Sequence, residues 1–430
     1  MKTLVCLVYL CVFLFNAGAQ SVISGPMVGH TTMRSAKIWV QLDQEADVQI
    51  QYGENQQMTS AISTRNRDGN TAEFALTGLE PGNEYSYTIL INGQLQKPST
   101  EYSFKTQPFW QFRTDPPSFK MVVGSCTYIN EEQYDRPGRP YGRGYEIFTS
   151  MAKEQPDVTL WLGDNIYLRE ADIGDRTGYI HRYTHTRKTP EMQALLQTGS
   201  HYAIWDDHDF GPNDHDGSWI HKDWALETFD LFWANPTTGT PDMTGTMTAF
   251  QYADIDFFLL DNRYHRTPRN LKNEASEILG REQIEWLIAN LLNSRAPFKM
   301  VAVGGQVVSD VAKYENHAVF EKERAYLLKR IAEEEIKGVV FLTGDRHHTE
   351  LSRIQKPEEP VIYDLTVSPL TSKSYSGDDE NNTHRVENTL VNTQNYGVLE
   401  FSGPRKARQM KISIFDTEGV ELWTQTLKSE

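Results

Sequence analysis

The chain has 430 residues and a formal net charge of −16, since 42 Lys and Arg residues stand against 58 Asp and Glu residues. This length suffices for a large core and for two domains, and the acidic excess argues against nucleic-acid binding through bulk electrostatics. No stretch beyond the amino-terminal segment is long and apolar enough for a transmembrane helix. The composition therefore favours a soluble, exported protein that holds cations.

Residues 1–19 are predicted to be a cleavable signal peptide. Lys2 provides a positive charge, residues 4–15 form an apolar core too short to span a bilayer comfortably, and Ala17-Gly18-Ala19 has the small side chains of a cleavage site. The mature chain would begin at Gln20 and would be secreted or periplasmic after Sec-type export. A retained membrane anchor is the alternative to cleavage.

Cysteine usage singles out one residue. Cys6 and Cys11 would leave with the signal peptide, so the mature chain would hold only Cys126 and could form no internal disulfide. An unpaired thiol in an oxidising compartment is a liability unless it is buried or bound. A lone cysteine is usually a small core residue, but Cys126 stands where a predicted strand ends in a loop, which makes it a candidate metal ligand.

Residues 20–108 are predicted to form a β-sandwich, because short strands of alternating polarity recur between turns. The expected strands are 37–42, 48–52, 73–76 and 85–89. Asn92-Gly93 predicts a hairpin turn. The run Leu-Glu-Pro-Gly-Asn-Glu-Tyr-Ser-Tyr at 79–87 resembles the corner before a late strand in fibronectin type III-like domains.

Residues 109–118 contain Pro116-Pro117 and lack periodicity, so they are predicted to be a linker. From residue 119 to residue 430, apolar strands alternate with amphipathic helices, a pattern typical of α/β layers. The expected strands are 120–124, 158–162, 201–204, 255–260, 300–303, 339–342, 410–415 and 420–427. The expected helices are 145–152, 281–293 and 320–336, and the polar, acidic segment 374–392 is expected to be a mobile loop.

Polar clusters follow four of the predicted strands, at the strand ends beyond which α/β sheets bind ligands. They are Gly124-Ser125-Cys126, Gly163-Asp164-Asn165-Ile166-Tyr167, Trp205-Asp206-Asp207-His208-Asp209 and Gly344-Asp345-Arg346-His347-His348. Thiolate, phenolate, carboxylate and imidazole together suit a strongly Lewis-acidic ion, and a shared carboxylate could hold two ions about 3.5–4 Å apart. Each cluster alone could be a turn or a solvated loop, but the four together predict a metal site.

These motifs resemble a known family. Gly163-Asp164-Asn165-Ile166-Tyr167 matches the Gly-Asp-x-x-Tyr motif of purple acid phosphatases. The four clusters and Leu260-Asp261-Asn262-Arg263, taken in order over residues 25–425, resemble the alkaline phosphatase D (PhoD-like) family of metallophosphoesterases. The resemblance implies an α/β (α+β) fold with a double β-sheet sandwich flanked by helices, and hydrolysis of phosphate monoesters, diesters or both.

The same resemblance implies two metal ions, Fe³⁺ and Ca²⁺. Fe³⁺ would be held by Cys126, Asp164, Tyr167 and His347. Asp164 would bridge to the Ca²⁺ site, which would also include Asp207 and Asp345. Two softer donors of the general metallophosphatase pattern are carboxylates in this chain, which favours a hard second ion. The best-known members of the family carry a twin-arginine signal, whereas this chain has a plain one.

Two residues are candidates for contact with the phosphate. The resemblance places His208 near the leaving group or the phosphate, where it would act as a catalytic residue. Arg263 follows a predicted strand and could hold a phosphate oxygen in bidentate fashion. A salt bridge between Arg263 and Asp261 is the equal alternative.

Several other residues are weaker candidates. Asn213, Asp214 and Gln306 could add metal ligands. His181 and His185 are expected on the surface, His30 in the structural part of the β-domain, and Asn381-Asn382-Thr383 is a glycosylation sequon by pattern alone.

Two other functions compete with the phosphoesterase hypothesis. A cysteine phosphatase loop would need Arg at position 132, which is Glu132. A non-catalytic, secreted calcium-binding adhesion module would explain the acidity and the β-domain, but it would not explain Tyr167, His208 or the unpaired cysteine. The sequence therefore predicts a metal-dependent enzyme for small phosphate esters, with no stable nucleic-acid binding.

Overall fold

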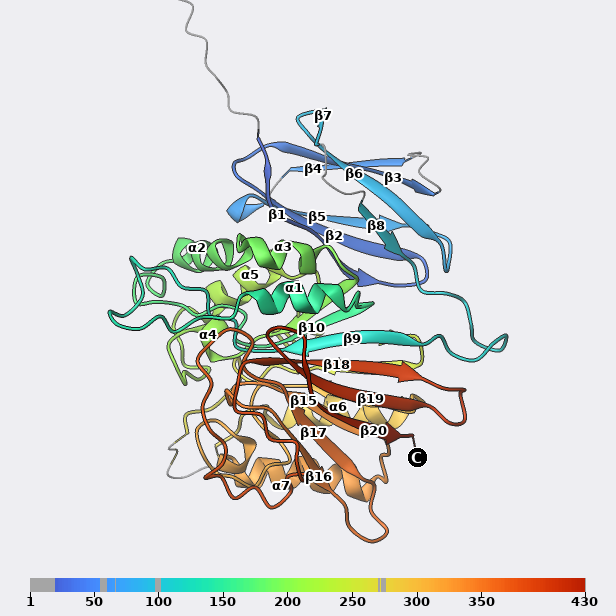
Figure 1. The fold of residues 1–430 in the computed structure, drawn as a ribbon, viewed down its shortest axis with the longest axis vertical. Coiled ribbons are helices and arrows are strands. Elements are labelled where there is room, and N and C mark those ends of the chain that lie inside the picture. Colours follow the sequence, from blue (N-terminus) through green and yellow to red (C-terminus); the bar gives the residue numbers. More distant parts are fainter. Residues whose placement is uncertain are drawn as a thin grey trace, which may run out of the picture.

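The computed structural model describes residues 20–54, 60–65, 67–96, 102–269, 271 and 276–429. The predicted signal peptide lies outside these residues. Two large sheets are stacked in the centre of the molecule, helices lie on their outer faces, and the amino-terminal strands form the end drawn in blue (Figure 1). None of the described helices has the length and apolar character needed to cross a membrane.

The first large sheet has nine strands in the order β20-β19-β18-β9-β10-β11-β1-β2-β5. Their bounds are β1 Val22–Thr31, β2 Ser35–Leu42, β5 Thr71–Thr77, β9 Phe119–Gly124, β10 Val158–Leu162, β11 Ser200–Ile204, β18 Asn395–Ser402, β19 Gln409–Asp416 and β20 Glu421–Lys428. Strands β9, β10 and β11 run parallel. Their carboxyl ends therefore meet at one edge, where three of the four polar clusters follow.

The second large sheet has six strands in the order β12-β13-β14-β15-β17-β16. Their bounds are β12 Thr248–Tyr252, β13 Ile255–Leu259, β14 Lys299–Ala302, β15 Val339–Thr343, β16 Glu350–Ile354 and β17 Ile362–Thr366. Strands β13, β14, β15 and β17 run parallel. Apolar side chains of both sheets share one core, among them Met121, Leu160, Leu162, Phe257, Met300 and Leu342. The predicted double sheet is confirmed.

Helices cover the outer faces of both large sheets. Beside the first sheet lie α1 Glu146–Lys153, α2 Arg176–Arg187, α3 Pro190–Leu196, α4 Asp207–Phe210 and α5 Lys222–Phe232. Beside the second lie α6 Arg281–Asn293 and α7 Glu321–Glu333. Helix α6 has the predicted bounds, because Ile284, Leu287, Ile288 and Leu291 recur at helical spacing and are all buried. Single 3₁₀ turns lie at Asp68–Asn70 and His317–Val319.

The amino-terminal strands form the predicted sandwich. Its outer sheet contains β3 Asp47–Glu54, β4 Ser60–Arg65, β6 Glu84–Ile91, β7 Gln94–Leu95 and β8 Tyr102–Lys105. Its inner sheet is β1-β2-β5, and a shared apolar core lies between the two. Asn92 and Gly93 make the predicted hairpin turn, with φ angles of 49° and 75°. Since β1 also pairs with β11 at Val28 and Ser200, one sheet crosses the boundary predicted at residue 108.

The segment 374–392 differs from the mobile loop that we expected. It lacks regular helices and strands, yet Glu380, Asn382 and Thr389 are buried. The Asn382 amide donates to Glu350 and to Ser352 of β16, both at 2.8 Å. Polar composition misled the prediction because these side chains bond to protein groups instead of water.

Candidate metal centre

The loops after β9, β10, β11 and β15 bring the predicted ligands together. Donor atoms lie within 4.8 Å of one another in four groups: Cys126, Asp164 and His347; Asp164, Asp207 and His208; Asp206, Asp207 and Asp345; and Asp207, Asp214 and Glu315. Asp164 belongs to two of the groups and Asp207 to three, so these two carboxylates connect the whole arrangement. Five of the six predicted metal ligands belong to these groups, and Tyr167 lies directly beside them.

The backbone at the centre is held in an uncommon conformation. Cys126, Asp164, Asp345 and His347 have φ angles of 63°, 50°, 69° and 57°. Residues other than glycine rarely adopt positive φ, and such strain concentrates at functional sites. Four of the six predicted ligands are therefore held in place at some cost to stability.

Two glycines allow the ligand loops to approach each other. Gly163 has a φ of 87°, which a residue with a Cβ adopts with strain. At Gly344 the reason is space, since a Cβ would lie 2.5 Å from the carbonyl oxygen of Leu162. Larger residues at either position would displace Asp164 or Asp345.

The first donor group and the adjacent Tyr167 together offer four kinds of ligand atom. The Tyr167 hydroxyl lies 3.1 Å from Asp164 Oδ2 and 3.2 Å from His347 Nε2. Cys126 Sγ lies 3.5 Å from Asp164 Oδ2. His347 Nδ1 contacts the carbonyl oxygen of Lys373 at 2.5 Å. Since a carbonyl can only accept, Nδ1 carries the hydrogen and Nε2 is left free as a donor atom for a metal.

Electrostatics at the centre favour a bound cation. Burial, reinforced by the charge of Asp207, raises the pKa of Asp164 well above its usual range. Burial raises the pKa of the Cys126 thiol to about 12, against hydrogen bonds from Ser368 and Ser125. A metal ion within reach reverses this, because it stabilises the deprotonated ligands.

Orphaned acceptors point to the same conclusion. Asp206 Oδ2 and Asp207 Oδ1 are buried and have no hydrogen-bond partner among the described residues. A buried carboxylate oxygen without a donor carries a large free-energy cost. A cation beside both oxygens would remove that cost, so the residues present fit a metal site.

Arg263 takes neither of the two roles that we expected, which were contact with a phosphate and a salt bridge with Asp261. Its side chain is fully buried, and Nε donates to Asp206 Oδ1 at 2.8 Å. Both terminal nitrogens pair with Glu315, while Asp261 accepts a hydrogen bond from the backbone N–H of Arg263 and not from its guanidinium. A guanidinium so enclosed and so committed to carboxylates has no face left for a phosphate. The geometry favours a positioning role, in which Arg263 holds Asp206 and Glu315 beside the donor groups.

His208 lies at the junction of the donor groups. Its backbone N–H donates to Asp164 Oδ1 at 3.3 Å, and its ring packs at a tilt against the ring of Tyr167, with centroids 4.1 Å apart. Burial, opposed by the charge of Asp207, lowers the pKa of the imidazole. A neutral ring here can donate a hydrogen bond, accept a proton or bind a metal.

The weaker candidates fall into two sets. Asp214 joins the group with Asp207 and Glu315, and the neighbouring Asn213 is exposed. Gln306 lies behind the centre, where its amide donates to Glu350 at 2.7 Å and accepts from Arg346 at 3.1 Å. The remaining histidines lie elsewhere: His181 contacts Glu131, His185 stacks on His181, and His30 contacts Tyr202.

Sequence reasoning missed several residues at the centre. Glu315 comes from the long segment between β14 and α7, and no motif marks it. Tyr141 and Tyr375 lie beside His347, with the Tyr375 ring stacked on the imidazole at 5.2 Å. Tyr375 is 47% exposed, so these aromatic rings border the open side of the centre. Both come from loops whose composition gives no sign of a site.

Comparisons with known proteins relate the chain to a family of phosphatases. The family described as PhoD-like phosphatase matches residues 121–407, and a family described as a domain of unknown function (DUF7800) matches residues 19–109. Alkaline phosphatase D of Bacillus subtilis (strain 168) is 23% identical over 350 residues, which are 70% of this chain and 56% of that protein. The chain thus spans just over half the length of this curated relative.

Solved structures show the same fold. A structure of PhoD superposes with a TM-score of 0.75 at 17% identity, over 94% of this chain and 91% of that one. A purple acid phosphatase from yellow lupin (Lupinus luteus) seeds gives a TM-score of 0.67 at 13% identity, over 94% and 74%. The family match covers well over half of the chain and contains all four polar clusters. The chain therefore belongs to the PhoD-like phosphatase family.

Proposed function

We propose that this protein is a secreted, metal-dependent phosphoesterase that hydrolyses small phosphate monoesters, diesters or both. The observation that carries the proposal is that Asp164 is shared between the donor group of Cys126 and His347 and the donor group of Asp207 and His208. Shared carboxylates are the usual means of holding two cations close enough to clamp one phosphoryl group. Export through the predicted signal peptide is part of the proposal.

The proposed ions are Fe³⁺ and Ca²⁺. Fe³⁺ would be held by Cys126, Asp164, Tyr167 and His347, and Ca²⁺ by Asp164, Asp207 and Asp345. The first set mixes thiolate, phenolate, carboxylate and imidazole, whereas the second is made of carboxylates alone, which suits a hard ion. When bound, such ions lower the pKa of water and stabilise the charge that develops on phosphate.

The protein's own residues have three tasks in this reaction. The Lys373 carbonyl fixes the His347 tautomer, so that Nε2 stays available. Arg263 holds Asp206 and Glu315 and partly neutralises the acidic site, which lets an anionic ester approach. His208 would donate a hydrogen bond or a proton to the leaving oxygen, a form of help worth about 10²–10⁴-fold in rate.

A calcium-binding adhesion module remains the competing hypothesis. It would need only the carboxylate groups, and nothing in it would require the thiol, phenol and imidazole that meet around Asp164. Turnover of an ester after metal loading separates the two functions, because an adhesion module would bind calcium and hydrolyse nothing.

The test uses the full mature chain loaded with Fe³⁺ and Ca²⁺. Nitrophenyl phosphate and bis(nitrophenyl) phosphate are assayed before chelation, after chelation and after metal is restored, together with elemental analysis. We expect hydrolysis of at least one ester, its loss on chelation and its return with metal. Asp164→Asn should abolish it, while Asp378→Asn, an exposed acid in the segment 374–392, is the matched control. Unchanged hydrolysis after complete metal removal would contradict the proposal.

A further inference from the structure

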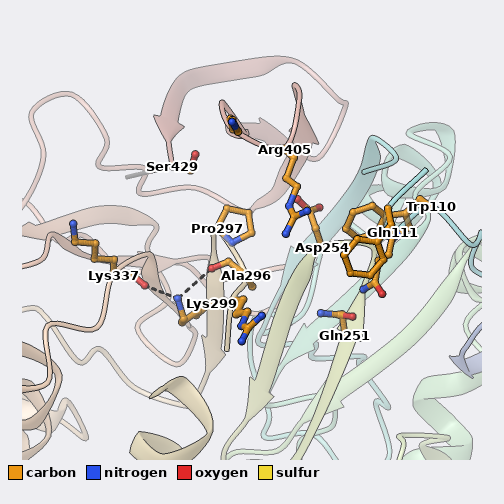
Figure 2. A pocket seen from close by; sticks show the side chains of 13 residues that line it. Trp110, Gln111, Gln251, Asp254, Ala296, Pro297, Lys299, Lys337, Arg405 and Ser429 are labelled. Atoms are coloured by element: carbon orange, nitrogen blue, oxygen red, sulfur yellow. Dashed lines mark hydrogen bonds between the residues drawn. The ribbon is translucent and has the colours of Figure 1, made fainter. Parts of the chain in front are cut away.

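A cavity of about 650 Å³, drawn in Figure 2, is lined by residues that take no part in the metal centre. Lys299 begins β14, Lys337 lies two residues before β15 and Asp254 directly precedes β13, so the cavity is at the amino ends of these parallel strands. The metal centre follows the carboxyl ends. The two sites therefore lie at opposite ends of the parallel strands of the second large sheet.

The lining of the cavity is strongly basic. Five of its side chains are cationic: Arg295, Lys299, Lys337, Arg405 and Lys406. The single acid among the described lining residues, Asp254, already pairs with Arg408 at 3.0 Å. In a chain with a net charge of −16, such a concentration of positive charge creates a local field that attracts anions.

Most of these cations have no partner of their own. Arg295, Lys337, Arg405 and Lys406 are exposed and form no ion pair with any residue that the structure describes. Lys299 differs, since its ammonium group is buried and donates to the carbonyl oxygens of Ala296 and Lys337 at 3.1 and 2.9 Å. Lys299 thus fixes the cavity wall, and the other four are free to contact a ligand.

An aromatic rim completes the cavity. Trp110 and Phe112 line it. The Phe112 side chain is 93% exposed and its backbone has a φ of 62°. Beside a cluster of cations, an exposed aromatic ring offers an apolar surface on which a ligand can pack.

The segment that carries Trp110 and the turn that carries Arg405 and Lys406 are hydrogen-bonded to the same side chain, so the cavity is preformed. The Arg408 guanidinium is fully buried and donates to the carbonyl oxygen of Pro117 at 2.5 Å and to that of Gly403 at 2.9 Å. The first of these contacts holds the segment that carries Trp110, and the second holds the turn that carries Arg405 and Lys406. A preformed site binds its ligand without first paying to order its loops.

We propose that this cavity binds a small organic anion that carries at least two negative charges and a flat apolar group. The volume falls within the range of about 300–1,000 Å³ that is typical of small-molecule sites. The exposed cations would meet the anionic groups, and the Trp110 and Phe112 rings would pack on the apolar group. The site is separate from the metal centre and does not depend on the proposed hydrolysis.

The test is calorimetric titration of the metal-loaded full chain with naphthalene-1,5-disulfonate, which has two sulfonates, an aromatic ring system and no ester bond. We expect saturable binding to one site that weakens as salt is raised. Arg405→Glu/Lys406→Glu should weaken binding by roughly tenfold or more. Phe112→Ser should also weaken it, without changing the salt dependence.

A matched control has the same change in net charge at a distant surface. Lys322→Glu/Lys329→Glu on α7 should bind the probe as the wild type does, and all variants should remain folded at the temperature of the titration. Equal weakening in the control would mean that only bulk charge acts, and would overturn the proposal. Absence of binding to the wild type, or loss of binding on chelation of the metal ions, would overturn it as well.

Discussion

At the scale of single residues, the metal centre is defined by which side chains the donor groups share. Asp164 lies between the group with Cys126 and His347 and the group with Asp207. Removing its charge should therefore affect both ions, whereas a change at Asp207 or Asp345 should affect mainly one. The number of ions lost therefore distinguishes a bridging ligand from a ligand that binds a single ion.

We predict that Asp164→Asn loses both ions, while Asp207→Asn and Asp345→Asn lose mainly Ca²⁺. The physical reason is that an amide oxygen lacks the charge needed to hold two cations at once. Elemental analysis of each purified variant measures the outcome. Normal content of both metals in Asp164→Asn would show that this carboxylate is not a bridge.

Tyr167 offers a spectroscopic prediction. Its hydroxyl contacts both Asp164 and His347, and a phenolate on Fe³⁺ would give a visible charge-transfer band. Tyr167→Phe should weaken or shift this band and leave the fold intact, since a single oxygen atom is lost. Absorption spectra of the iron-loaded proteins test it, and an unchanged band would assign the colour to another ligand such as Cys126.

His208 can be tested for proton transfer. We predict that His208→Ala keeps its metal ions and loses turnover by about 10²–10⁴-fold on alkyl esters. Activated nitrophenyl esters should lose less, because a good leaving group needs little help from an acid. Loss of metal from the variant would instead make His208 a ligand, a role that its position beside Asp164 and Asp207 also permits.

At the scale of secondary-structure elements, the motifs and the strong strands were predictable, and contacts between distant segments were not. Strands β10 and β15 are continuous buried runs followed directly by Gly-Asp, so local pattern was enough. Strand β1 escaped prediction because its ten residues VISGPMVGHT contain Pro and two Gly, and only pairing with β2 and β11 makes it a strand. Glu315 could not be predicted because its role depends on Arg263, 52 positions away in the chain.

The Arg263 network gives a stability prediction. Arg263→Ala would leave Asp206 buried without its counterion and Glu315 paired with Arg266 alone, and breaking a buried pair in this way costs about 3–5 kcal/mol. Urea unfolding of the metal-free proteins measures the loss directly. Arg295→Ala, which removes an exposed and unpaired arginine, should cost little. Equal, small losses in both variants would mean that Arg263 is not a structural anchor of the centre.

At the scale of the whole molecule, the amino-terminal sandwich and the remainder share one sheet and one core. Trp39 of β2 is fully buried, and its indole N–H donates to the carbonyl oxygen of Leu231 in α5 at 2.8 Å. The Arg187 guanidinium lies 4.9 Å from the centre of its ring. Figure 1 shows the helices beside β1 and β2, between the amino-terminal strands and the strands that lead to the metal centre. The boundary predicted at residue 108 therefore reflects a change in sequence pattern more than a break in packing.

We predict that Trp39→Ala destabilises the whole chain in a single transition. Truncating a buried Trp costs about 3–5 kcal/mol, and the lost contacts belong to α5 as well as to β2. Because α5 packs in the same core as α4, which carries Asp207 and His208, unfolding of this core should release the metal ions. Circular dichroism and ester hydrolysis, followed along one urea titration, should lose signal at the same midpoint, shifted below that of the wild type.

Val48→Ala, in the core enclosed by the sandwich sheets alone, provides the comparison: a smaller shift is expected, again with coincident midpoints. If Trp39→Ala instead melts the sandwich while hydrolysis persists to the wild-type midpoint, the two parts fold independently and the shared sheet contributes no cooperativity.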